Sequence, residues 1–345
     1  PSFRSTFGLH FNDRTFDDDA NSSAPFFEES EGKFFIQSTL DLSPGLQIEL
    51  GGEVLNSFKY DQWNGGYRGR LIKSFGNNNK LFAGIRQSAY EPASITFNNP
   101  GNIEHATYTQ SRNVEVGWQY QGDLHNLTFN VYYQHMYNLT VIHSNEAKYY
   151  LVDHPIIPVG PLITDVDLNG VANQYGVEGL WNMVSKNGWR MEINQSVYKS
   201  VRGEEDEELT GGRYDGRFAT HVSCAKEIIH EKNKKHRIWN FSLRGLLNGG
   251  LWEPAIDTEL SGTFNQTIAV YPGNYNLQLP TYKRIDAGVS YTISTSKIRW
   301  QYRLDIQNLF SLTNIAYHYY DPFQHKVLAQ EQLGIIPVLS VQASW

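Results

Sequence analysis

Apolar and polar residues alternate one by one over several stretches of this chain. A period of two places the apolar side chains on one face of a β-strand and the polar side chains on the other. In residues 285–294 the apolar set is Ile285, Ala287, Val289, Tyr291 and Ile293. The same alternation recurs at residues 114–120, 127–133, 239–243, 298–306 and 339–345. The pattern predicts an all-β, antiparallel protein.

The two faces of these strands differ in an unusual way. Charged side chains such as Arg303 and Asp305 lie in the strand middles on one face, and large aromatic side chains such as Trp300 and Tyr302 lie on the other. Aromatic residues that contact lipid and polar residues that face water fit the wall of a transmembrane β-barrel. Rings near the strand ends would then form the girdles at the membrane interfaces.

Short and long connections alternate along the chain. The short ones fall near residues 43–45, 76–79, 121–126, 185–188, 230–236 and 294–297. The long polar ones cover about 12–32, 57–65, 91–112, 137–172, 202–216, 248–283 and 310–334. Short periplasmic turns and long extracellular loops are typical of outer-membrane barrels. We therefore expect one barrel region over residues 1–345, with about fourteen strands and both termini on the short-turn side.

Composition excludes several classes of protein. The 345 residues carry a net charge of −7, so the chain lacks the basic surplus that nucleic-acid binding requires. The single cysteine, Cys224, excludes an internal disulfide framework and a cysteine-based zinc site. No apolar run reaches the roughly 18 residues of a transmembrane helix. Aromatic residues make up 14% of the chain, which favours strands over helices.

Particular motifs point to a family. The chain reads LPTYKRIDAGVSYTIS from residue 279, then RWQYRLDIQNLF, and it closes on LGIIPVLSVQASW. A D-x-x-x-S-Y strand, a second strand ending in Q-N-L-F and a last strand closing on an aromatic residue are typical of TonB-dependent outer-membrane receptors. Here these are Asp286–Tyr291, Gln307–Phe310 and Trp345. The segments at 98–121, 174–181 and 248–259 are similar to earlier parts of the same family, so the chain resembles it over about residues 85–345.

The resemblance implies a fold and a function. Members have a 22-stranded barrel that is filled by an N-terminal plug and preceded by a TonB box, and this sequence shows neither. We therefore expect it to be the C-terminal fourteen strands of a longer polypeptide; a closed, independent fourteen-strand barrel is the alternative. The implied function is active uptake of a siderophore, vitamin, peptide or glycan across the outer membrane of a Gram-negative cell. The implied partners are the lipid bilayer, the TonB complex through a plug outside this chain, the barrel-assembly machinery, and surface lipoproteins or other envelope subunits.

Aromatic-rich loops are the candidates for ligand contact, since tyrosine and histidine combine stacking surface with hydrogen bonds. They lie at 105–110, 148–161 and 317–323. The candidate residues are Tyr108, Tyr149, Tyr150, His154, Tyr317, His318, Tyr319 and Tyr320. The alternative is that these rings pack one loop against another or join the upper girdle.

Other chemistry is sparse in this sequence. Residues 165–170, DVDLNG, match the opening of a calcium-binding loop through Asp165, Asp167 and Asn169, but the twelfth position is Gly176 where a bidentate glutamate should stand. A Gly/Asn-rich turn in a long loop is the alternative. The acidic run at 203–212 is expected to be solvated. No motif of a hydrolase or nucleotide-binding enzyme occurs, so no catalytic residue and no cofactor beyond that calcium ion are predicted.

The chain ends on an apolar strand face. Leu339, Val341, Ala343 and Trp345 alternate with polar residues, so we expect Trp345 to close the last strand with its indole at the periplasmic interface. In the family that the chain resembles, a terminal aromatic residue is part of the signal read by the barrel-assembly machinery. Two other classes stay open: a structural or interaction barrel in a larger outer-membrane assembly without transport, and a soluble β-rich carbohydrate-binding protein.

Overall fold

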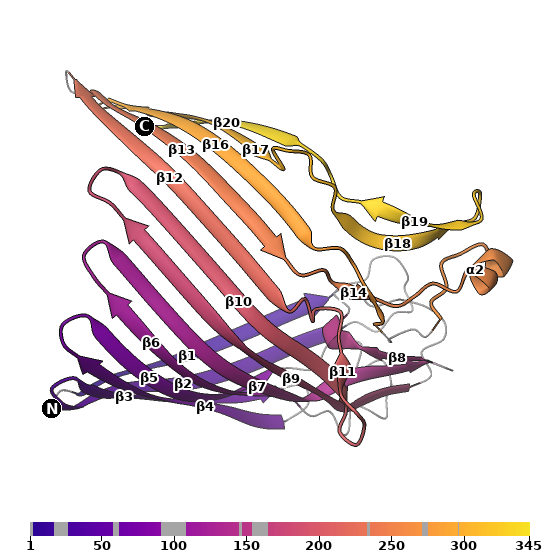
Figure 1. Cartoon of the computed structure of the whole chain (residues 1–345). Coiled ribbons are helices and arrows are strands. Elements are labelled where there is room, and N and C mark those ends of the chain that lie inside the picture. Colours follow the sequence, from indigo (N-terminus) through magenta and orange to yellow (C-terminus); the bar gives the residue numbers. More distant parts are fainter. Residues whose placement is uncertain are drawn as a thin grey trace. The chain divides into compact units, whose positions relative to one another are not determined.

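Fourteen strands follow one another along a single antiparallel sheet (Figure 1). The computed structural model describes residues 3–16, 27–57, 62–90, 108–144, 147–153, 165–232, 235–270, 275–295 and 297–345. The strands on this path are β1 (Phe3–Phe16), β2 (Phe27–Ser43), β3 (Leu46–Ser57), β4 (Gln62–Phe75), β5 (Asn79–Tyr90), β6 (Thr109–Gln121), β7 (His125–Ser144), β9 (Asp165–Val184), β10 (Trp189–Glu204), β12 (Phe218–Lys232), β13 (Lys235–Asn248), β16 (Tyr282–Ser294), β17 (Arg299–Gln307) and β20 (Ile336–Ser344). The predicted all-β class is confirmed, and the predicted number of about fourteen strands matches this path. Two short strands that pair beside it bring the described sheet to sixteen strands.

The short connections fall where the sequence predicts them, and glycine explains two of them. Gly45 and Gly188 have φ angles of +76° and +81°, a region that side chains other than glycine rarely adopt. A Cβ atom at Gly188 would lie 2.4 Å from the backbone oxygen of Glu227. These two turns therefore require glycine for both conformation and space.

The remaining elements lie at the other end of the strands, called the long-loop end below. The elements are β8 (Ala147–Tyr150) beside β7, η2 (Leu151–Asp153), β11 (Thr210–Gly211) beside β10, the pair β14 (Trp252–Glu253) and β15 (Leu277–Gln278), the helix α2 (Thr258–Phe264), and the hairpin β18 (Ile315–Asp321) and β19 (Lys326–Glu331). Asp257 caps α2, because its Oδ1 accepts a hydrogen bond from the backbone N–H of Leu260 at 2.9 Å.

The chain divides into two compact units. Unit 1 comprises Pro1–Trp118, Val131–Tyr175 and Ser200–Thr210, and unit 2 comprises Gln119–Asn130, Gly176–Lys199 and Gly211–Trp345. In unit 2 the strands β12, β13, β16, β17 and β20 pair without a register shift. Their apolar face remains uncovered by the described chain, with Leu243 and Phe241 exposed by 52% and 46%. Aromatic neighbours still contact each other across the strands, as Trp239 and Tyr291 do in a tilted arrangement with 4.6 Å between ring centroids.

The two ends of the strand order are β1 and β20, and each pairs on one side only within the described residues. The last strand ends at Ser344, so Trp345 lies one residue beyond it and is 94% exposed. Leu339 and Val341 are also exposed on the apolar face of β20. Among the described helices, none has the length and apolar character needed to cross a bilayer.

The long connections differ from the sequence prediction. Residues 165–170 are not a turn, because β9 begins at Asp165 and continues to Val184. The predicted loop 310–334 contains the β18–β19 hairpin, and the predicted loop 248–283 contains α2. Strands thus extend into segments whose polar composition suggested loops.

Candidate functional site

A buried ion pair organises the long-loop end of unit 1. Arg202 lies near the end of β10, and its Nε donates to the carboxylate of Asp153 at 2.5 Å. The side chains of these two residues are only 3% and 4% exposed. The guanidinium also donates to Thr210 Oγ1 at 2.8 Å and lies 4.3 Å from the ring centroid of Tyr150. Three separate segments are therefore held together at Arg202.

A second polar cluster lies close to it in the same unit. Lys148 Nζ is 2.5 Å from Glu207 Oε1 and 3.0 Å from Glu204 Oε1. The hydrogen bond to Glu207 raises the pKa of Lys148 above its usual value. His143 Nε2 lies 3.1 Å from Asp167 and 3.7 Å from Glu204. The acidic run, expected to be only solvated, thus contributes two carboxylates to ion pairs with β7 and β8.

The predicted calcium ligands lie on a strand. Asp167 and Asn169 follow each other on one face of β9, where next-but-one side chains are about 6.6 Å apart and do not wrap around an ion. Asp167 contacts His143, and Asn169 Nδ2 contacts Glu204 Oε2 at 3.4 Å. The side chain of Asp165 lies outside the described part. No group of three metal-ligating side chains occurs among the residues described, and the calcium site stays a prediction.

The aromatic candidates differ strongly in exposure. Tyr108, Tyr150 and Tyr320 are nearly buried, with 3%, 6% and 5% of their surfaces exposed. Tyr149 packs against the small apolar cluster of Ile142 and Val166. Burial raises the pKa of both Tyr149 and Tyr150.

The rest of that candidate set is more open. Tyr317 is half exposed and meets Tyr319 edge to face at 6.4 Å between ring centroids. His318 lies on the same strand and is partly buried. His154 lies outside the described residues.

In unit 2 the last long connection packs on the one before it. His318 contacts the buried Glu253 of β14 twice, through its ring Nδ1 and through its backbone N–H at 3.2 Å from Oε2. The backbone N–H of Tyr320 donates to Thr267 Oγ1 at 3.0 Å. In Figure 1 the hairpin β18–β19 accordingly lies beside α2. His318 therefore joins two long connections, and its predicted contact with a ligand stays a prediction.

The two motifs through which the chain resembles its family, D-x-x-x-S-Y and Q-N-L-F, meet in one network of hydrogen bonds around the buried Asp286. Asp286 accepts hydrogen bonds from the backbone N–H of Asn308 at 2.9 Å, from Arg244 at 2.6 Å and from Arg284 at 2.9 Å. Asn308 has a φ angle of +50° and exchanges hydrogen bonds with the backbone of Leu312 at 2.9 Å. The D-x-x-x-S-Y and Q-N-L-F motifs thus supply the two halves of one fixed turn at the end of β17.

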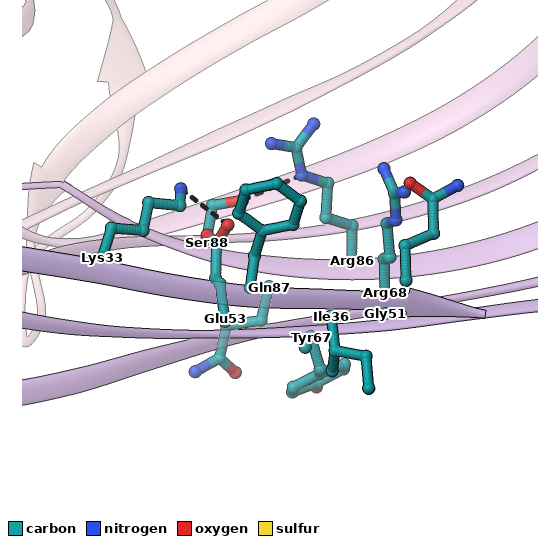
Figure 2. Close-up of a pocket in the computed structure, with 13 residues that line it drawn as sticks. Lys33, Ile36, Gly51, Glu53, Tyr67, Arg68, Arg86, Gln87 and Ser88 are labelled. Carbon is teal, nitrogen blue, oxygen red and sulfur yellow. Dashed lines mark hydrogen bonds and ion pairs between the residues drawn. The ribbon is translucent and has the colours of Figure 1, made fainter. Parts of the chain in front are cut away.

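Figure 2 shows a hollow on the polar face of the sheet in unit 1. Lys33, Arg68 and Arg86 stand on one side of the sheet, and Ile36 and Tyr67 lie on the opposite side. A recess of about 450 Å³ adjoins this hollow. Its lining residues are Glu49, Arg68, Gly69, Arg70, Gly84, Ile85, Arg86, Ser88, Tyr90, Ser111, Asn113, Glu115 and Gln134. We call it the arginine recess.

Sequence reasoning missed the arginine recess. The signal was present as GGYRGR at 65–70, where glycine and arginine alternate on a strand. Register decides which residues meet across strands, and this register pairs Arg68 with Arg86 and with Gly51. The periodicity of one strand alone does not specify that pairing.

The fold defines a class of protein: an antiparallel sheet of membrane-spanning type with one lipid-compatible face, one polar face and long connections at one end. A family model described as the β-barrel of TonB-dependent receptor-like proteins matches residues 2–309. The chain belongs to this family and is a β-barrel protein of the outer membrane. Members are receptors and not enzymes, in agreement with the prediction of no enzymatic activity.

Solved structures of similar fold agree with this assignment. The ferric yersiniabactin uptake receptor FyuA from Yersinia pestis is 14% identical with a TM-score of 0.63, and the match covers 99% of this chain and 51% of that receptor. The FrpB iron transporter from Neisseria meningitidis is 11% identical with a TM-score of 0.63, over 98% and 52% of the two chains. The ferripyoverdine receptor of Pseudomonas aeruginosa is 11% identical with a TM-score of 0.59, over 98% and 44%.

The chain therefore spans about half the length of these proteins. At such low identity the likeness concerns the fold alone. No curated protein gives a significant match to this sequence.

Proposed function

We propose that this chain is the wall and the outer loops of a receptor that takes up a scarce ligand across the outer membrane with energy from TonB. The observation that carries the proposal is the family match over residues 2–309. The similar structures named above include an uptake receptor and an iron transporter. The polar face would line the interior, and the apolar face would contact lipid.

In this proposal, residues at the long-loop end bind the ligand. Tyr317 and Tyr319 present ring surface there, while Tyr108, Tyr150 and Tyr320 act by packing the loops. His318 would orient the hairpin through Glu253. The TonB complex would act through a plug outside this chain, and the barrel-assembly machinery would recognise Trp345.

Uptake in cells tests the proposal. The complete gene that contains this chain is expressed in a strain lacking its own copy, with TonB present or deleted. Uptake is followed for labelled ferric siderophores, copper, vitamin B12, a peptide mixture and an oligosaccharide mixture. We expect uptake of one class to require both the receptor and TonB. If deletion of the gene disrupts a surface assembly and changes the uptake of none of these, the structural-barrel alternative replaces this proposal.

A further inference from the structure

The lipid-compatible face of unit 1 becomes polar toward the long-loop end. Along β7, the half-exposed Tyr133 is followed on the same face by His135 and then by Tyr137. Along β6, Arg112 precedes the half-exposed Val114 on that face. Both changes occur on the side of the long loops, which lie outside the cell in barrels of this type. The border between acyl chains and lipid headgroups therefore crosses the strands at this level.

A polar network connects β6, β7 and β9 at this border. Asn173 on β9 accepts a hydrogen bond from the Tyr133 hydroxyl at 2.8 Å, and its Oδ1 lies 2.7 Å from His135 Nδ1. The Tyr137 hydroxyl donates to Gln110 Oε1 on β6. The strands β6, β7 and β9 are neighbours in the sheet, so the polar border extends over all three.

Two rings of this network form one aromatic surface. His135 and Tyr137 are stacked, with 5.7 Å between their ring centroids and 22° between their planes. The guanidinium of Arg112 lies 4.9 Å from the centroid of the Tyr137 ring, and its Nε donates to Gln87 Oε1 at 3.1 Å. Contacts with neighbouring strands thus hold both rings in place. A surface that is ordered in advance loses little side-chain entropy when a ligand binds.

A recess of about 470 Å³ adjoins the two rings, within the range of about 300–1,000 Å³ that is typical of small-ligand sites. Its lining includes Arg112, His135, Tyr137, Asn173, Glu205 and Glu207. Lys148, at 2.5 Å from Glu207, and Arg112 balance the charges of the two carboxylates. The recess therefore combines donors and acceptors without a charge surplus, which suits the hydroxyl groups of a ligand better than an ion.

We propose that this recess, called the outward recess below, binds the sugar headgroup of a glycolipid in the outer leaflet. A sugar ring packs its C–H groups on aromatic side chains, and its hydroxyl groups both donate and accept hydrogen bonds.

The position of the outward recess favours a lipid over a free sugar. It continues directly from the lipid-compatible face at Tyr133, so acyl chains would lie along that face while the sugar contacts His135 and Tyr137. Residues of unit 1 alone line the outward recess. The inference goes beyond the proposed function, because binding of such a lipid requires no transport.

Lipid binding to the complete purified receptor tests this inference. The receptor is kept in lauryldimethylamine oxide, a detergent without sugar, and bound lipid is quantified by native mass spectrometry. The probes are monophosphoryl lipid A, which carries a glucosamine disaccharide, and phosphatidylglycerol, which is anionic and has no sugar ring. Glucosamine serves as the free sugar. We expect lipid A to bind with a Kd roughly tenfold or more below those of the other two probes.

Substitutions in the outward recess locate the binding. His135→Ala and Tyr137→Leu should each weaken lipid A binding by roughly fivefold or more, because each removes ring surface. Tyr137→Phe keeps the ring and loses only the hydrogen bond to Gln110, so it should bind nearly as well as the unmodified receptor.

A matched control uses another aromatic stack. Trp300 and Tyr302 are stacked on the apolar face of β17 with 6.3 Å between ring centroids, but they lie near the short-turn end. Tyr302→Leu should therefore leave lipid A binding unchanged. An equal loss of binding in Tyr302→Leu and Tyr137→Leu would overturn the inference.

Other occupants would give different results. Equal binding of phosphatidylglycerol and lipid A would indicate ordinary lipid contact, and glucosamine binding as tight as that of lipid A would indicate a site for a soluble sugar. Unchanged lipid A binding in both His135→Ala and Tyr137→Leu would also overturn the inference. The proposed function fails separately, through absence of TonB-dependent uptake in a receptor that still binds lipid A.

Discussion

At the scale of single residues, Asp286 joins the two sequence motifs through which the chain resembles its family. It is 8% exposed and accepts hydrogen bonds from one backbone N–H and two arginines. A carboxylate with three donors is well compensated, and removing it leaves those donors without their acceptor. Asp286 therefore holds the turn at Asn308 in place, and we assign it no contact with a ligand.

Asp286→Ala should destabilise the protein. We expect a loss of about 1–3 kcal/mol in the free energy of unfolding, since three donors lose a charged acceptor. Urea unfolding of the detergent-solubilised protein measures this loss. Asp305→Ala is the control, because its partner Arg303 is 56% exposed and such a pair contributes under about 1 kcal/mol. Equal losses in the two variants would contradict the role assigned to Asp286.

A second residue-scale prediction concerns acid. The backbone N–H of Phe323, at 2.8 Å, holds the pKa of Asp321 below its ordinary value. Because the folded pKa is lower than the unfolded one, this stabilisation is complete above the ordinary value of about 3.9 and is lost as pH falls through the folded pKa. Hydrogen exchange in the β18–β19 hairpin should quicken over that range. Asp321→Asn should abolish this pH dependence, and its persistence would contradict the assignment.

At the scale of elements, turns and strands were predicted well, and long connections were not. Glycine and asparagine clusters specify the short turns locally, as at Gly45 and Gly188. The strand β9 includes all of DVDLNG, whose polar residues suggested a turn, because Asp167 and Asn169 contact His143 and Glu204 on neighbouring strands. Such partners are distant in sequence, so the periodicity of a single strand does not predict them. The arginine recess escaped prediction for the same reason.

Gly66→Ala tests the packing of the polar face at element scale. The new Cβ atom would lie 2.7 Å from the backbone oxygen of Gln87 and from Glu53 Oε1. We expect a loss of about 1–3 kcal/mol in stability, because the backbone oxygen moves only with its strand. Gly245→Ala is the matched control, since a Cβ atom at this position on β13 would meet nothing within 4 Å. Unfolding in urea compares the two variants, and a larger loss at Gly245 would refute the steric account.

At the scale of the whole molecule, the account depends on a sheet whose two faces meet different surroundings. Leu243 and Phe241 remain about half exposed on the apolar face, while ion pairs such as Arg244 with Asp286 occupy the other. Exposed apolar surface of this extent indicates an apolar environment on that face. Lipid on the apolar face and water on the polar face are in keeping with the family to which the chain belongs.

Deletion of Trp345 should affect assembly of the complete receptor more than ligand affinity. The side chain is 94% exposed and lies one residue beyond β20, so its removal takes away little packing within the described part of the chain. Quantifying heat-modifiable receptor in outer-membrane fractions, together with ligand affinity of the assembled portion, measures both effects. Normal receptor levels after the deletion would count against an assembly role for this residue.

The central claim, that adjacent residues of one strand face lipid and water, is tested most directly by the accessibility of spin labels in the assembled receptor. Ser242 and Leu243 are neighbours on β13 with opposite faces. Each is replaced by cysteine in a Cys224→Ser background and labelled, and relaxation by oxygen is compared with relaxation by a water-soluble nickel chelate. We predict that oxygen dominates at position 243 and the nickel chelate at position 242. Equal access of the nickel chelate to both positions would contradict the account.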